Sequence, residues 1–193
     1  MFSVRIHGRG GQGAVTSAET LSVAAFDQGL HAQAFPSFGS ERTGAPVVAF
    51  CRIDDLPIRA HDPVSEPDAV IVQDPTLMRL VPVLAGIPAG GFVLVNSSRP
   101  FPELGIDDLV SGLDPGRLVT VPATDLSRRV LGRALPNTAL LGGFAALTGV
   151  VSLAAVQDAI RQRFGGEVGQ ANAEVARLAH AHVRLAIGGG IRA

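Results

Sequence analysis

The sequence predicts a three-layer α/β/α fold, in which helices cover a mixed, mostly parallel sheet. Three observations support this fold class. Strand-like and helix-like stretches alternate along the chain. An apolar run, Phe2–Ile6, passes through a glycine segment into the helix-like stretch Ala14–Gln28, as in the first βαβ unit of a Rossmann-like fold. The 193 residues suffice for one domain with a full core, and no linker or internal repeat divides them.

The strands are expected at short runs rich in β-branched residues. Val47–Ile53 is one such run, and Asp54-Asp55 after it predicts a turn into Leu56–Arg59, so that the two runs form an antiparallel hairpin. This hairpin makes the predicted sheet mixed. The remaining strands are expected at Leu30–Phe35, Ala69–Val72, Gly91–Val95 and Leu118–Val121.

Helices are expected where apolar residues recur at helical spacing between a capping residue and a glycine. Asp125, Asn137 and Ser152 are the expected N-caps of three of them. For Asn137, this capping role and close packing of the small residues after it are a sufficient explanation. The later helices are expected at Thr76–Leu84, Leu126–Leu131, Asn137–Gly149, Leu153–Phe164 and Glu167–Ile187.

The glycine segment, His7–Gly13, joins the first strand to the first helix. It fits the dinucleotide-binding pattern G-x-G-x-x-G. Such a junction presents unpaired backbone N–H groups at the positive end of a helix dipole, where a phosphate binds. The alternative is that the glycines only permit a tight turn and close packing. The residues predicted to contact a ligand are Gly8, Arg9, Gly10, Gly11, Gln12 and Gly13.

NAD is the weaker interpretation of this pattern. Dinucleotide-binding domains carry an acidic residue at the end of the second strand, about 20 residues on, which binds the ribose. Here the second strand, Leu30–Phe35, ends in Pro36-Ser37-Phe38 without a carboxylate. A phosphate or a subunit contact is therefore the stronger interpretation.

The segment Ala34–Pro46 is the second candidate site. It combines two phenylalanines, an adjacent acid–base pair, two glycines and two prolines between two strands. Loops of this length with such rigid residues are typically functional, and the alternative is a surface loop pinned by its phenylalanines. We predict an interface or ligand loop that contains Phe35, Ser37, Phe38, Glu41, Arg42 and Thr43.

Composition narrows the function classes. The 16 basic and 17 acidic residues nearly balance, which argues against nucleic acid and membrane surfaces as partners. The single cysteine, Cys51, lies in an apolar strand and is expected to be a buried, inert thiol rather than a cluster ligand. His180 and His182 are two residues apart, on different helix faces, and are not expected to bind a metal. The chain shows no catalytic set and no signal peptide or membrane span, which predicts a cytoplasmic protein.

Three segments together resemble the gamma subunit of pyruvate and related 2-oxoacid:ferredoxin oxidoreductases. They are Val4–Gly13, Phe35–Pro46 and Gly132–Gly142, which occur in the family's order and span most of the chain. The third adds Asn137 to the candidate interface or ligand residues. Thr43 departs from the family, which usually has a second arginine or another polar residue there.

The resemblance implies a complex that decarboxylates a 2-oxoacid on thiamine diphosphate, passes electrons through [4Fe-4S] clusters to ferredoxin or another acceptor, and forms acyl-coenzyme A. Alpha, beta and delta-type subunits are then expected to hold the thiamine diphosphate and the clusters. The gamma chain would be non-catalytic, pack on those subunits and bind coenzyme A. A high apolar fraction, 47%, agrees with a surface that is covered in use. The alternatives are a free-standing NAD(P)-binding oxidoreductase domain and a purely structural interaction module.

Overall fold

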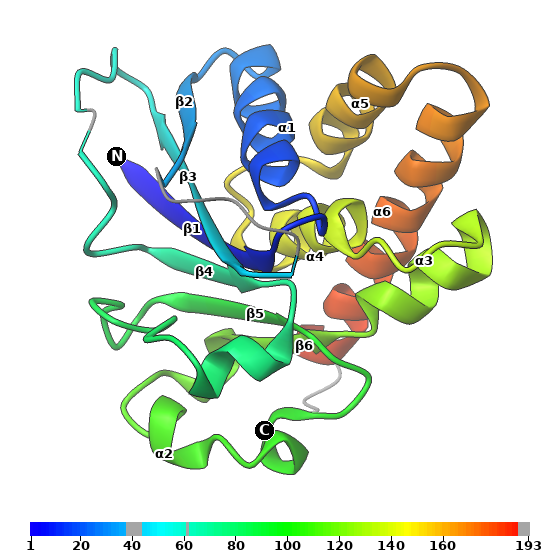
Figure 1. Cartoon of the computed structure of the whole chain (residues 1–193). Helices are drawn as coiled ribbons and strands as arrows, with labels where there is room; N and C mark the ends of the chain where they lie inside the picture. The colour runs from blue at the N-terminus through cyan, green and yellow to red at the C-terminus, as the bar shows by residue number, and fades with distance from the viewer. Residues whose placement is uncertain (38–43, 61, 189–193) are drawn as a thin grey trace.

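The sheet carries six strands in the order β2-β3-β1-β4-β5-β6 in the computed structural model, which describes residues 1–37, 44–60 and 62–188 (Figure 1). Strands β1, β4, β5 and β6 run parallel, and β3 runs antiparallel to both β1 and β2. The sheet is therefore mixed and mostly parallel, as predicted. The strands are β1 Phe2–Arg9, β2 His31–Pro36, β3 Pro46–Asp54, β4 Ala69–Val72, β5 Phe92–Asn96 and β6 Leu118–Val121.

The antiparallel pairing differs from the predicted hairpin. Residues 56–59 form no strand, and β3 lies instead between β1 and β2. Its register pairs Val47 with Gly8 and Pro46 with Arg9, which extends β1 three residues beyond the predicted end at Ile6. The prediction was wrong because the β-branched residues of β3 pair with strands distant in sequence rather than with the run that follows them.

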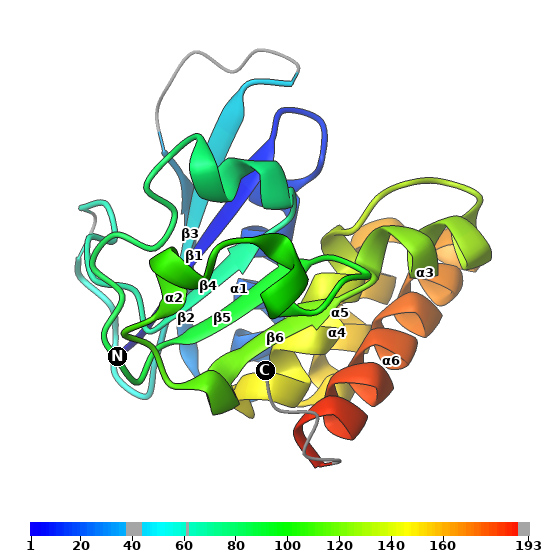
Figure 2. The same ribbon diagram turned by 90° about the horizontal axis from the view of Figure 1, so that it is seen from below.

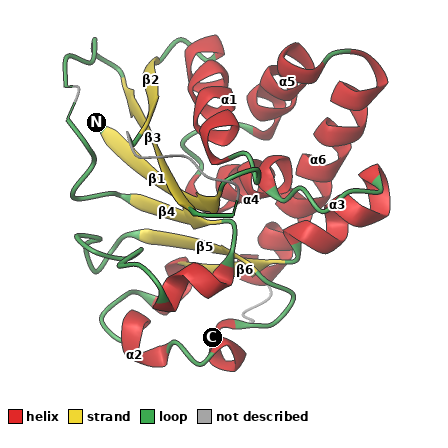
Figure 3. Ribbon diagram, in the orientation of Figure 1, coloured by secondary structure: helices red, strands yellow, loops and turns green. Residues whose placement is uncertain are grey.

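Long helices pack on one face of the sheet (Figure 1 and Figure 3). Small apolar residues fill the interface, as in α4, where Gly142 and Gly143 are buried and allow close contact with α6 and the sheet. Strand residues Val4, Ile6 and Cys51 contribute to this core. The helices are α1 Ala14–Asp27, α3 Ala123–Leu131, α4 Asn137–Thr148, α5 Leu153–Phe164 and α6 Gly166–Gly188.

The opposite face is covered by short helices and extended segments (Figure 2). A second, smaller core forms there from β4, β5 and the side chains of Leu77, Phe101 and Ile106. The predicted helix Thr76–Leu84 is shorter than expected, since only Pro75–Arg79 is helical and forms a 3-10 turn. Other short elements were not predicted, namely η2 Phe101–Leu104, α2 Asp107–Val110 and η3 Pro115–Arg117.

Arg5 and His7 of β1 and Arg52 of β3 lie on this second face of the sheet. The Arg5 guanidinium is buried and donates to the carbonyls of Val64, Val83 and Ala85. Arg52 is also buried, and it donates to the carbonyl of Asp62. Each arginine thus ties an extended segment onto the sheet.

The helix ends confirm one predicted cap and contradict two. The Ser152 hydroxyl accepts a hydrogen bond from the Ala155 N–H at 3.1 Å, as predicted. Asp125 and Asn137 are not N-caps, because α3 and α4 follow directly on Pro122 and Pro136. Proline fixes φ near the helical value, so each helix begins earlier than a polar cap would place it. Within the described ranges, the helices are all too short or too polar to cross a membrane.

Candidate functional site

The glycine segment forms a tight turn between β1 and α1, held by its own backbone and one side chain. The Gly10 N–H donates to the Ala45 carbonyl at 2.9 Å. The Arg9 N–H donates to Gln12 Oε1 at 2.7 Å, and the Gln12 N–H donates back to the Arg9 carbonyl at 2.9 Å. Gly10, Arg9 and Gln12 therefore shape the turn, and their backbone N–H groups are already engaged.

The N–H groups of Gly11 and Gly13 are not engaged in this way by any described residue. Both have positive φ, +95° and +82°, a conformation that favours glycine. Among the described residues, nothing accepts a hydrogen bond from the N–H groups of Gly11, Gly13 or Ala14. A Cβ added at Gly11 would meet no atom within 4 Å, so open space lies beside it. These N–H groups stand at the N-terminus of a 14-residue helix, where the dipole attracts an anion.

The first residue of α4 lies against this turn. A Cβ at Gly13 would be only 2.9 Å from Asn137 Nδ2, so the N-termini of α1 and α4 meet here. The Asn137 residue is 8% exposed, and its amide makes no hydrogen bond with another described residue, yet its polar atoms are not among the fully buried ones that lack a partner. The amide is therefore accessible and free to donate a hydrogen bond to a bound group.

A series of polar side chains follows the carboxyl ends of the parallel strands. Gln73, after β4, is fully buried and donates from Nε2 to the Ser17 hydroxyl at 3.0 Å. The Ser17 hydroxyl donates to the Gly13 carbonyl at 3.0 Å, which fixes the start of α1. Asn96, the last residue of β5, donates to the Gln73 carbonyl and accepts from the Thr124 N–H, which fixes the start of α3.

The sequence interpretation missed these roles of Gln73 and Asn96. A signal was available, because polar residues that directly follow parallel strands gather at the edge of the sheet where ligands bind. Gln73 also explains Gly8, since a Cβ at Gly8 would overlap Gln73 Oε1. Gly8 therefore has a packing role in this structure.

The Arg9 side chain is engaged within the chain. Its Nε donates to Asp74 Oδ2 at 2.6 Å, and its other nitrogens donate to the Gly44 carbonyl and the Thr76 hydroxyl. Burial disfavours ionisation of Asp74, but hydrogen bonds from Thr76 and Arg9 outweigh burial and lower its pKa. Arg9 thus anchors the glycine segment to the turn after β4.

The structure describes both ends of the second candidate site, residues 34–37 and 44–46. Phe35 lies on β2, with its ring centroid 5.2 Å from that of Phe50 and 5.3 Å from the Arg52 guanidinium carbon. The Ser37 N–H donates to the Val48 carbonyl at 2.8 Å. These contacts hold the start of the loop onto β3. The predicted loop residues Phe38, Glu41, Arg42 and Thr43 lie outside the described residues.

Among the described residues, neither the cysteine nor a cluster of metal ligands supplies a reactive group. Cys51 is fully buried, and burial raises its pKa to about 12, so it is an inert thiol as predicted. In the described ranges, no three His, Cys, Asp or Glu side chains are placed to hold a metal ion. The groups that converge between α1 and α4 are neutral hydrogen-bond donors. Their chemistry suits the binding of an anion.

The strand order also weakens the NAD interpretation. In a dinucleotide-binding unit the second strand lies next to the first, which brings its terminal acid to the ribose. Here β3 separates β1 from β2, so the end of β2 lies two strand spacings away, about 9.6 Å. Pro36 ends β2 without a carboxylate.

Known proteins are similar to this chain in both fold and sequence. The model of the pyruvate ferredoxin/flavodoxin oxidoreductase family matches residues 3–182. The common gamma subunit of the pyruvate and ketoisovalerate oxidoreductases of Thermococcus kodakarensis is 49% identical over 179 residues, which cover 93% of this chain and 95% of that subunit. The crystal structure of the pyruvate oxidoreductase subunit PORC of Thermotoga maritima has a TM-score of 0.80 and 36% identity, and covers 93% of this chain and 95% of its own.

A more distant enzyme shares the fold alone. The 2-oxoglutarate:ferredoxin oxidoreductase of Magnetococcus marinus, solved with 2-oxoglutarate, coenzyme A and succinyl-CoA bound, has a TM-score of 0.74 at 17% identity. The match covers 95% of this chain and 31% of that one. The family match and the near-complete coverage of the gamma-type relatives decide the assignment. The chain belongs to the pyruvate ferredoxin/flavodoxin oxidoreductase family.

Proposed function

We propose that this chain is the non-catalytic gamma subunit of a thiamine-diphosphate-dependent 2-oxoacid:ferredoxin oxidoreductase, and that it binds a phosphate of coenzyme A between α1 and α4. Companion alpha, beta and delta-type subunits hold the thiamine diphosphate and the [4Fe-4S] clusters. They release CO2 from the 2-oxoacid and pass two electrons to ferredoxin or another acceptor. The acyl group leaves on the coenzyme A sulfur.

The unpartnered Asn137 amide carries the coenzyme A part of this proposal. It lies against Gly13, and the N–H groups of Gly13 and Gly11 at the start of α1 are free within the described part of the chain, so donors from the N-termini of two helices lie in the same region. A phosphate oxygen accepts hydrogen bonds from all of them and gains from both dipoles. The remaining predicted residues, Gly8, Arg9, Gly10 and Gln12, shape the turn that presents these donors.

A charge-reversing variant of the amide tests the phosphate site. Asn137→Asp keeps the side-chain shape and places a carboxylate at the first position of α4. The helix dipole stabilises a negative charge there, so the fold should remain intact. It repels a phosphate, so the coenzyme A concentration for half-maximal acceptor reduction should rise by about tenfold or more in the assembled complex. Asn137→Ser, which stays neutral, should cause a smaller rise.

Two glycines with the same backbone conformation provide a matched pair. Gly11 and Gly29 both have positive φ, and a Cβ at either would meet no atom within 4 Å. Gly11→Ala and Gly29→Ala should therefore strain the chain equally, whereas only Gly11→Ala places a methyl group in the path of the phosphate. Calorimetric titration of the complex with coenzyme A should detect weaker binding for Gly11→Ala alone. Equal affinities for both variants and for Asn137→Asp would refute the phosphate site.

The subunit assignment has a separate test. Reduction of methyl viologen with pyruvate or a branched 2-oxoacid is measured for the chain alone and for the chain with its companions. We expect no turnover by the chain alone, because the part of it that the structure describes offers no pair of nucleophile and base. Turnover without companions would refute the non-catalytic role and leave the phosphate site to be judged on binding.

A further inference from the structure

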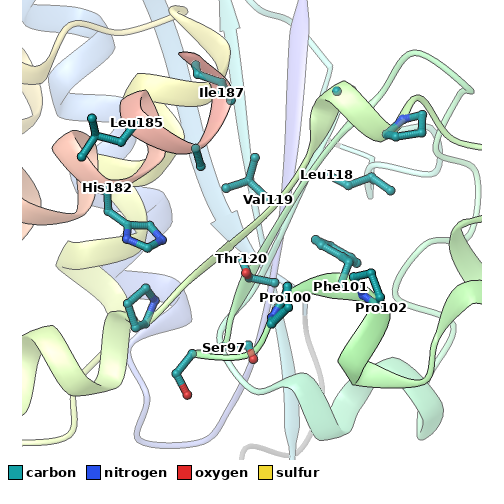
Figure 4. A pocket seen from close by; sticks show the side chains of 15 residues that line it. Ser97, Pro100, Phe101, Pro102, Leu118, Val119, Thr120, His182, Leu185 and Ile187 are labelled. Atoms are coloured by element: carbon teal, nitrogen blue, oxygen red, sulfur yellow. The ribbon is translucent and has the colours of Figure 1, made fainter. Parts of the chain in front are cut away.

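The free edge of the sheet lies in an apolar slot. Strand β6 is the last strand on its side. A cavity of about 770 Å³ opens along it, between the last turns of α6 and the segment that leads into η2. Figure 4 shows Leu185 and Ile187 on one side, Pro100 and Phe101 on the other, and Val119 between them.

The backbone of β6 has hydrogen-bonding groups that point into this slot. The Val121 carbonyl accepts from the Ser97 N–H at 2.8 Å, so it faces β5. Because strand residues alternate in direction, the N–H and C=O groups of Thr120 face away from β5, as does the carbonyl of Leu118. The Leu118 N–H is bonded to the Pro115 carbonyl, and Pro122 has no N–H to donate. Thr120 has no backbone partner on its free side among the described residues.

The slot lacks the charges that protect many edge strands. Natural edges are often blocked by lysines or inward-pointing charges, as well as by other devices. None of the described residues that line this slot is Lys, Arg, Asp or Glu, and His182 is the only titratable side chain among them. Leu185 is 74% exposed on its rim. An uncharged slot with free backbone donors and acceptors fits an extended segment with apolar side chains.

The shape of the slot argues against a second copy of this chain. In a symmetric pair, β6 of each copy would have to reach β6 of the other at about 4.8 Å. The walls formed by α6 and by Pro100–Pro102 stand on both sides of the edge, so they would collide before two recessed strands could meet. The occupant must therefore project into the slot.

We propose that an extended, apolar segment of a companion subunit enters this slot and adds a seventh strand beside β6. One residue of that segment, placed opposite Thr120, exchanges two backbone hydrogen bonds with it. Its neighbours place apolar side chains against Leu185 and Phe101. The proposal rests on the proposed place of the chain in a multi-subunit complex and is independent of the phosphate site.

Hydrogen exchange tests the new strand directly. The amide of Thr120 should exchange at least about tenfold more slowly in the purified complex than in the isolated full chain, since pairing protects it. Equal exchange in both would overturn the proposal. Protection in the isolated chain that grows with its concentration would show self-association and would overturn it as well. If the wild-type chain binds no companions, the subunit proposal itself fails, which this comparison separates from an empty slot.

Two matched pairs of variants test the contacts. Thr120→Pro removes the outward N–H without touching the ladder to β5, while Thr120→Val keeps that N–H, so only the first should weaken binding of the companions, by about fivefold or more. Leu185→Asp places a charge on the rim, and Val168→Asp places one at an exposed site of α6 that does not line the slot. Gel filtration of the mixed subunits should show loss of assembly for Thr120→Pro and Leu185→Asp only. Normal assembly of both would refute the proposal.

Discussion

The two faces of strands β1 and β3 differ in how they are stabilised. On the helix face, Val4, Ile6 and Cys51 are fully buried against apolar side chains of long helices. On the other face, Arg5, His7 and Arg52 are almost as buried, but extended segments and short turns cover them. The first face is held by the burial of apolar surface, and the second by hydrogen bonds from cations to backbone carbonyls.

The difference shows why one strand can face two environments. Residues of β1 alternate strictly, with apolar side chains toward the helices and polar ones toward the extended segments. Segments without regular structure leave carbonyls unbonded, and the two arginines supply donors for them. The buried arginines therefore hold the extended segments onto this face, whereas packed helices cover the other face.

The largest loss of stability is expected for a substitution in the helices that cover the first face. A Cβ at Gly142 would overlap the backbone carbonyl of Ala176 in α6, so Gly142→Ala must push two helices apart. We expect a loss of more than about 3 kcal/mol in the free energy of unfolding. The neighbouring Gly143→Ala meets only side chains, the nearest at 3.2 Å, and should stay within about 1 kcal/mol of wild type. Urea unfolding of both variants measures the difference, and equal midpoints would contradict it.

A slightly smaller effect is expected on the opposite face. Arg5→Ala leaves a cavity and three carbonyls without their donor, which should cost about 3 kcal/mol. Arg5→Met fills the cavity but not the hydrogen bonds and should cost about 2 kcal/mol. Hydrogen exchange should rise in residues 62–68 and 82–86 in both variants. A uniform rise over the whole chain would instead show that Arg5 supports the sheet itself.

The third prediction concerns pH and the same face. Burial and the positive charge of Arg5 lower the pKa of His7 to about 4. The unfolded chain, with an ordinary histidine pKa near 6.5, binds more protons than the folded chain between these two pKa values. The contribution of His7 to the free energy of unfolding is therefore fully present above about pH 6.5 and is lost as the pH falls toward 4. At pH 5 the loss from this group is about 2 kcal/mol.

Replacement of the histidine isolates this contribution. His7→Leu should flatten the fall in stability between pH 7.5 and pH 5 by about 2 kcal/mol relative to wild type, as measured by urea midpoints at each pH. His182, which is exposed, is the matched control, and His182→Leu should keep the wild-type slope. The same slope in all three proteins would show that His7 is not buried in its neutral form.

The smallest expected effect concerns a single cap on the helix side. Ser152→Ala removes the hydrogen bond to the Ala155 N–H and should cost about 1 kcal/mol. Ser152→Asp keeps an acceptor at the same place and should restore most of that loss. Thermal unfolding of the two variants checks this, and an unchanged melting temperature for Ser152→Ala would mean that packing alone holds α5.

Local patterns predicted the elements that depend on neighbours in sequence. Ser152 acts through a contact within three residues, and α4 and α5 begin and end almost where predicted. The pairing of β3 with β1 depends on residues about 45 positions apart, which no local pattern encodes. The false hairpin at Leu56–Arg59 has this cause.

The candidate site shows the same division. The glycine segment was predicted from its spacing, and the positive φ values of Gly11 and Gly13 agree with a turn that needs glycine. The sequence could not show that Arg9 bonds to Asp74, because that contact joins residues 65 positions apart. Nor could it show that Asn137, expected to cap its own helix, faces Gly13 instead.

The central position of β1 has a consequence for synthesis. It is the first of the six strands to leave the ribosome, yet both of its neighbours, β3 and β4, come from much later in the chain. Until residues 46–54 have emerged, the apolar side chains of β1 have no strand to pair with. Contacts of such long sequence separation slow folding and prolong the exposure of unpaired strands. Until then, α1 is the helix that can cover the apolar face of β1.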